Sequence, residues 1–226
     1  MSIAIVNYGM ANLRSVQKAF EEVGAQAEIV TRPEQIRSAD KVVLPGVGAF
    51  ADAVKTLRES GLVEPIEQHI QSGKWFLGIC LGLQMLFDVG YEDGEHRGLG
   101  IVPGKVVRFD VDKGRSSIHF EARRGEQLLQ SYSKETRGLK VPHMGWNQLI
   151  IKKPSPLLNG LPAGCGVYFV HSYHVVPNDP AIVATTTDYG GEFVSSIWRD
   201  NVLATQFHPE KSQKIGLQIL ANFASL

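Results

Sequence analysis

The chain has 226 residues, 43% of them hydrophobic and 20% charged, which suits one large globular domain with a substantial buried core over residues 1–226. Basic and acidic residues number 23 each, so the overall charge gives no electrostatic basis for binding nucleic acid or an anionic membrane. No apolar run approaches the ~20 residues that cross a bilayer. With two cysteines and no leader-like start, we expect a reduced, cytoplasmic protein without a membrane role.

Short apolar runs alternate with helical patterns over the first third of the chain. This rhythm predicts βαβ units, and therefore a mainly parallel sheet covered by helices on both faces. Strands are expected at 3–6, 27–30, 41–44 and 75–79, and helices at 13–23, 49–59 and 62–71.

The character changes to strand-like runs after about residue 100, which predicts an additional antiparallel layer. The segment 113–140 has more basic than acidic residues and few apolar ones, so we expect a long solvated excursion without an assigned fold. Residues 211–226 carry apolar side chains at helical spacing and predict a closing helix. The expected strands are 104–109, 146–151, 167–170, 182–187, 194–198 and 202–206.

Cys80 is the candidate nucleophile. It lies in the stretch GICLG at 78–82, directly after an apolar strand and before a segment, 83–87, that can continue as a helix. This is the arrangement of a nucleophile elbow, in which flanking glycines permit a strained turn and close backbone approach. The helix start lowers the pKa of a thiol and offers N–H groups to an oxyanion. The alternative is a buried apolar cysteine, the interpretation that we favour for Cys165.

His208 is the candidate general base, because it directly follows the predicted strand 202–206 and stands two residues before Glu210. A histidine oriented by a carboxylate takes a proton from a cysteine near neutral pH and returns it to the leaving amine. Alone, the His-Pro-Glu sequence would indicate only a strand-ending turn. The other six histidines lack a carboxylate at such close spacing or are expected to be solvated: His143, His171 and His174 are rivals, and His69, His96 and His119 are the solvated set.

Metal and nucleotide sites are not indicated, and we expect no cofactor. The Cys-x-x-Cys and His-x-x-x-His spacings typical of metal ligands do not occur. The glycine turn PGVG at 45–48 lacks the Lys-Ser/Thr ending of a phosphate-binding loop. Because it follows the predicted strand 41–44, its N–H groups could instead contact an oxyanion.

Six ordered stretches resemble the class I, Cys-His-Glu glutamine amidotransferases over essentially the full length. Within that family they are most similar to the glutaminase subunits of imidazole glycerol phosphate synthases. The stretches are NYGMANL at 7–13, PGVGAF at 45–50, GICLGLQ at 78–84, PHMGWN at 142–147, YFVHSY at 168–173 and HPEKSQ at 208–213.

The resemblance implies a flavodoxin-like, doubly wound, mainly parallel sheet with an additional antiparallel layer. It implies that Cys80 attacks the side-chain amide of glutamine, that His208 acts as base and then acid, and that Glu210 orients His208. The N–H groups of Leu81 and Val47 match the oxyanion hole, with a peptide reorientation expected at Val47 when the partner is loaded. The expected substrate contacts are Gly48, Gln84, Glu92, Ser172 and Tyr173.

The partner implied by the resemblance is a (β/α)8-barrel cyclase/synthase subunit, joined to this chain in a heterodimer. Ammonia is expected to pass inside the complex, where the barrel makes imidazole glycerol phosphate and an aminoimidazole carboxamide ribotide in histidine biosynthesis. Trp146 is the expected anchor, a common role of interface tryptophans; alternatively, it starts a core strand. The expected partner contacts are Pro142, His143, Met144, Trp146 and Asn147.

Three other functions compete with this interpretation of the sequence. A glutaminase of the same type could serve a different synthase, such as one that aminates a surface-polysaccharide sugar. A non-catalytic binding subunit would lack Cys80, His208 or Glu210, and all three are present. A self-standing glutaminase would be fully active alone, whereas a partner-gated one needs the synthase and its ligand.

Overall fold

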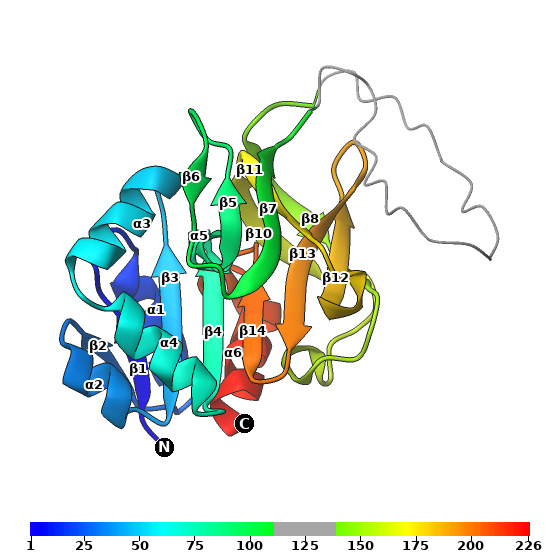
Figure 1. Cartoon of the computed structure of the whole chain (residues 1–226). Helices are drawn as coiled ribbons and strands as arrows, with labels where there is room; N and C mark the ends of the chain where they lie inside the picture. Colours follow the sequence, from blue (N-terminus) through cyan, green and yellow to red (C-terminus); the bar gives the residue numbers. More distant parts are fainter. Residues whose placement is uncertain (111–138) are drawn as a thin grey trace.

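A computed structural model of the chain describes residues 1–110 and 139–226 (Figure 1). The excursion expected at 113–140 therefore lies almost entirely outside the described residues. Within the described ranges, no helix has the length and apolar character needed to span a membrane.

Five parallel strands form the first part of the central sheet, in the order β2-β1-β3-β4-β14. Their side chains are almost all buried, as expected where helices cover both faces. The prediction of a mainly parallel sheet is confirmed for this part. The strands are β1 (Ile3–Val6), β2 (Ala27–Val30), β3 (Lys41–Gly46), β4 (Trp75–Cys80) and β14 (Val202–Thr205).

Helices cover both faces of this sheet (Figure 1), and each face of the sheet has its own apolar core. Successive strand residues point to opposite faces, so Ala4 and Val6 join one core while Ile3 and Ile5 join the other. Helices α2, α3 and α4 pack on the first core, and α1 and α6 on the second. The helices are α1 (Leu13–Glu22), α2 (Pro33–Ser38), α3 (Phe50–Glu59), α4 (Val63–Gln71), α5 (Leu81–Met85) and α6 (Gln213–Ser225).

Antiparallel strands extend the sheet beyond β14, which confirms the additional antiparallel part. The extension runs through β13 (Glu192–Arg199), β11 (Tyr173–Pro177), β7 (Val102–Arg108), β5 (Phe87–Gly90) and β6 (His96–Arg97). Its neighbouring strands pair antiparallel except β7 and β5, which pair in parallel. Beside β13 lie β12 (Val183–Asp188) and β9 (Ile150–Ile151). A separate antiparallel pair consists of β8 (His143–Gln148) and β10 (Gly166–His171). The short 3-10 helices are η1 (Pro156–Leu158), η2 (Pro180–Ile182) and η3 (Pro209–Lys211).

Several elements differ from the sequence-based expectation. Helix α2 and strands β5, β6 and β11 were not expected, and the helix after Cys80 ends at Met85 because the chain turns into β5 at Phe87. The strand expected at 146–151 is two strands, separated at Leu149, whose side chain is buried and whose N–H donates to the carbonyl of Cys165. The break lets β8 and β9 join different sheets.

Glycine at position 82 allows α5 to lie directly against the end of β3. An added Cβ would stand only 1.8 Å from the carbonyl oxygen of Leu44, closer than any non-bonded contact allows. Gly78 is similar, since a Cβ there would lie 2.9 Å from the carbonyl oxygen of Gly82. The two glycines therefore let strand, turn and helix stack closely around Cys80.

The variant Gly82→Ala is expected to lose at least about 3 kcal/mol of unfolding free energy, because backbone must move to admit the methyl group. Gly166→Ala is the matched control: its Cβ would meet nothing closer than 3.9 Å, and a change within about 0.5 kcal/mol is expected. Denaturant unfolding of both variants checks the difference, and equal midpoints would contradict the close-packing argument.

Candidate active site

Cys80 stands at the junction of β4 and α5 with a backbone conformation that L residues rarely adopt. Its φ is 54° and its ψ is −106°, and its side chain is buried. Strain of this kind persists only where the surroundings enforce it, which the close-packed glycines on either side do here. The strand, strained turn and helix predicted around Cys80 are therefore present, with the sulfur at the carboxyl end of the parallel strands.

His208 and Glu210 follow β14, the strand that lies beside β4, so the sheet brings them to Cys80. The Nδ1 atom of His208 lies 2.8 Å from Oε1 of Glu210, and both side chains are buried. Backbone bonds fix His208 further: its N–H donates to the Tyr168 carbonyl, and its own carbonyl accepts from the Ser212 hydroxyl. The carboxylate accepts from Nδ1, which leaves Nε2 as the ring nitrogen that exchanges a proton.

The electrostatic surroundings favour the charged form of His208. Burial lowers the pKa of His208, but the charge of Cys80 and the bond with Glu210 outweigh it, and the pKa lies above its ordinary value. The Nε2 atom is buried and has no hydrogen-bond partner among the described residues. Burial disfavours the imidazolium, whereas Cys80 and the Glu210 carboxylate favour it.

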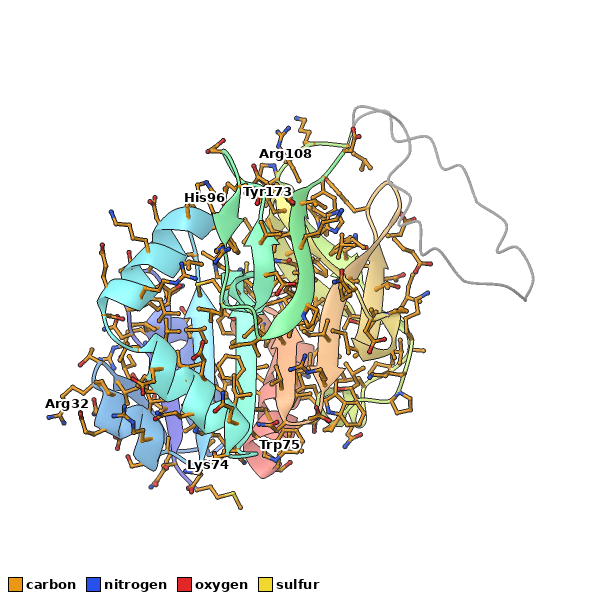
Figure 2. All side chains as sticks on the ribbon, in the orientation of Figure 1. Arg32, Lys74, Trp75, His96, Arg108 and Tyr173 are labelled. Atoms are coloured by element: carbon orange, nitrogen blue, oxygen red, sulfur yellow. The ribbon has the colours of Figure 1, made fainter. Side chains whose placement is uncertain are left out.

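A pocket of about 390 Å³ opens over Cys80 and His208 and collects most of the residues expected at the site. Figure 2 shows Tyr173 from this pocket at one end of the molecule, opposite Lys74 and Trp75 at the start of β4. Val170 also lines the pocket and was not anticipated from the sequence. The expected residues lining the pocket are Val47, Gly48, Cys80, Leu81, Gln84, Glu92, Pro142, Ser172, Tyr173 and His208, together with the rival histidine His171.

The two expected oxyanion donors are in different states. Leu81 is the first residue of α5, so its N–H has no acceptor within the helix. The N–H of Val47 donates instead to the carbonyl of Met10, at 3.0 Å. Gly48 has a φ of 102°, and its Cβ position would lie 2.9 Å from the Met10 side chain. Among the described residues, the Leu81 N–H is therefore without an acceptor, whereas the Val47 N–H is engaged.

The expected substrate contacts are held by specific hydrogen bonds. The carboxylate of Glu92 accepts from the N–H of Phe50 at 2.6 Å, which fixes the loop after β5 against the start of α3. Gln84 donates to the carbonyl of Tyr173 at 3.0 Å and to the side chain of Gln206 at 3.2 Å. Both N–H positions of Gln84 are engaged, so its Oε1 is the atom left to accept a bond from a ligand.

The rival histidines form a buried aromatic cluster and not a second base. Rings of Phe109 and Phe193 pack against His171 and His174. Burial lowers the pKa of His143 and of His174 to about 4, and holds the pKa of His171 well below its ordinary range. These rings are therefore neutral.

The expectation that His69 is solvated is wrong. Its side chain is buried on α4, and Nε2 lies 3.1 Å from the carbonyl of Trp75. The helical pattern of 62–71 placed it on the helix but did not reveal that its face packs against β4. His96 is partly exposed on β6, and His119 lies outside the described residues.

The segment expected to bind a partner is β8, and its side chains divide between two faces. Met144 and Trp146 are exposed, at 62% and 52%, and Trp146 lies within β8 and does not start a strand. His143 is buried, stacked on Phe169 and Tyr189. The outward face of this strand thus presents two exposed apolar side chains, Met144 and Trp146, next to the exposed polar Gln148.

The described residues hold no candidate metal site. No group of three or more His, Cys, Asp or Glu side chains in 1–110 and 139–226 is placed to hold a metal ion. Cys165 is buried between apolar residues of the second core, and burial raises the pKa of its thiol, as expected of a structural cysteine.

The chain belongs to the class-I glutamine amidotransferase family, whose pattern matches residues 4–225. A protein of Syntrophotalea carbinolica named imidazole glycerol phosphate synthase subunit HisH is 54% identical, over 99% of this chain and 100% of that protein. The protein of the same name from Aquifex aeolicus is 52% identical, over 99% and 96% of the two chains. The structure of PurLQS from Thermotoga maritima is 18% identical with a TM-score of 0.70, over 99% and 97%, and supports the fold alone.

In the variant Cys80→Ala, the pKa of His208 is expected to fall, because the burial that lowers it remains while the charge of the sulfur is lost. The titration of the His208 ring protons by NMR measures this pKa. Cys165→Ala removes the other buried thiol and is expected to leave the His208 titration unchanged. A His208 pKa that is the same in both variants would refute the electrostatic pairing of Cys80 with His208.

Proposed function

We propose that this chain is the glutaminase subunit of an imidazole glycerol phosphate synthase, which hydrolyses glutamine and delivers ammonia to a barrel-shaped synthase subunit in histidine biosynthesis. The observation that carries the proposal is the buried pair His208–Glu210 beside the strained Cys80. The names of the relatives, at 54% and 52% identity over nearly full length, supply the pathway. A single domain over 1–226 and a cytoplasmic location stay predictions.

The reaction begins when the Cys80 thiolate attacks the side-chain carbonyl carbon of glutamine in the pocket. The carbonyl oxygen becomes an oxyanion, and the His208 imidazolium gives its proton to the nitrogen, so that ammonia leaves and a thioester remains. His208, now neutral, takes a proton from water as the hydroxide attacks the thioester. Glutamate leaves and the thiolate is restored. Glu210 holds the imidazole in the required orientation throughout.

Partner control is expected to act through the peptide before Val47. While the Val47 N–H donates to Met10, the oxyanion has Leu81 alone as a backbone donor. Loss of one such donor slows acyl transfer by roughly 10²–10³-fold. A partner that favours the rotated peptide would raise the rate by a similar factor, so that ammonia is released when a receiving enzyme is in place.

The partner surface is proposed to be the outward face of β8. Met144 and Trp146 are two of the large exposed hydrophobic side chains, and Trp146 packs edge-on against Tyr168 of β10. Pro142 lines the pocket at the start of this strand. A barrel docked here would contact the pocket rim directly, a short path for ammonia. His143 and Asn147 support the strand from within.

Glutamate release from glutamine tests the proposed function. We expect slow release by the chain alone, and release roughly 10²–10³-fold faster with an imidazole glycerol phosphate synthase barrel and its ribotide, as the second oxyanion donor is supplied. Cys80→Ala is expected to reduce release by on the order of 10⁴-fold or more, whereas Cys165→Ala keeps it. Release that is indifferent to the barrel would reject this partner, and release by Cys80→Ala would reject the nucleophile.

Trp146→Ala is expected to weaken barrel binding by about tenfold or more, since a half-exposed tryptophan beside the exposed Met144 is a typical interface anchor. Ile151→Ala is the control, because Ile151 is 40% exposed but lies on β9. Calorimetry of each variant with the barrel gives both dissociation constants. Unchanged affinity for Trp146→Ala would exclude β8 as the docking face.

A further inference from the structure

Gln206 is a fully buried polar side chain next to the nucleophile, and the reaction described above does not use it. It follows β14 directly, and its backbone N–H donates to the carbonyl of Ser195. Its side-chain Nε2 lies 3.7 Å from the sulfur of Cys80. A buried amide keeps such a position only if every polar atom has a partner, so the direction in which this amide points is fixed by its neighbours.

The direction follows from the carbonyl of Tyr173, which can only accept. It accepts from Nδ1 of His171 at 2.8 Å and from Nε2 of Gln84 at 3.0 Å. Gln84 must therefore present its NH2 group to this site. The second N–H of that group donates to Oε1 of Gln206 at 3.2 Å. With its oxygen committed to Gln84, Gln206 can offer only N–H to the sulfur.

The hydrogen bonds that meet at the Tyr173 carbonyl continue toward the proposed partner face. Because His171 donates from Nδ1, its neutral ring accepts at Nε2, where Nδ1 of His143 donates at 3.2 Å. Asn147 in turn lies 3.3 Å from Nε2 of His143 and donates to it. Burial keeps both rings neutral, which this pattern requires. A directed series of hydrogen bonds thus joins β8 to the Tyr173 carbonyl, where it meets the bonds that orient Gln206.

We propose that Gln206 is a further catalytic residue, whose side-chain N–H stabilises the thiolate of Cys80 and whose orientation is fixed by Gln84 and the Tyr173 carbonyl. The sulfur has a second polar neighbour, the carbonyl of Val170 at 4.0 Å, which accepts from a thiol but repels a thiolate. Gln206 supplies a donor that offsets this repulsion at a buried sulfur. The inference deepens the proposed function and rests on Cys80 as its nucleophile.

The test is the pH dependence of Cys80 alkylation by iodoacetamide, which reports the thiolate and needs neither glutamine nor a barrel. Measured in a Cys165→Ala background, Gln206→Met keeps the length of the side chain and removes the donor. We expect alkylation about tenfold slower at neutral pH, with the same plateau rate at high pH, because a hydrogen bond to a charged atom is lost. An unshifted pH profile would overturn the proposal.

A second variant guards against misfolding of the first. Gln206→Glu has the shape of glutamine but places a carboxylate beside the sulfur, and is expected to slow alkylation at neutral pH more than Gln206→Met does. Alkylation by Gln206→Glu as fast as in the parent would also overturn the proposal. Gln218→Met, at an exposed glutamine on α6, is the matched control and should alkylate like the parent.

The orienting role is tested by a double-mutant cycle with Gln84→Met. We expect Gln84→Met to slow alkylation by itself and to have no further effect in Gln206→Met, because it acts through Gln206. Additive effects would reject the orienting role. The outcomes are separable from the proposed function: a chain whose sulfur titrates as expected but which releases no glutamate with the barrel would contradict that function alone.

Discussion

The structure depends on one close contact, the passage of the first turn of α5 against the carbonyl of Leu44 at the end of β3, where only a glycine at position 82 fits. This contact sets how sharply the chain turns after β4, and so it enforces the positive φ of Cys80. It also aligns the start of α5 with the glycine turn that follows β3. Cys80 and both expected oxyanion donors are therefore positioned by the packing of backbone on backbone, which leaves little freedom for side chains to compensate.

The second half of the site comes from a distant part of the sequence through sheet order. Strand β14 inserts beside β4, and its parallel direction brings His208 to the edge where Cys80 stands. Helix α6 packs directly against η3, since a Cβ at Gly216 would lie 1.8 Å from the carbonyl oxygen of Pro209. The buried ammonium of Lys41 bonds to the carbonyl of Ala224 and ties the end of this helix to the start of β3. His208 is thus supported by the same core that supports Cys80.

The sequence was sufficient for features that are local and insufficient for those that depend on packing between distant segments. The elbow at Cys80 and the pair His208–Glu210 could be predicted because each lies within a few residues and uses special side chains. Helix α2 is too short to show a period, and β5 was hidden in the apolar run that continues α5. Gln206 gave no signal, since its role depends on Gln84 and Tyr173, which lie far from it in sequence.

The neutral histidines beneath the pocket make the fold itself sensitive to acid. Burial lowers the pKa of His143 and of His174 to about 4, from an ordinary 6.5. The unfolded chain therefore takes up these protons first, so their contribution to stability is fully present above pH 6.5 and is lost as the pH falls toward about 4. Each ring represents on the order of a few kcal/mol. Protonation of His143 or His174 at acid pH would therefore weaken the packing of β8 and β11 around the ring of Phe109.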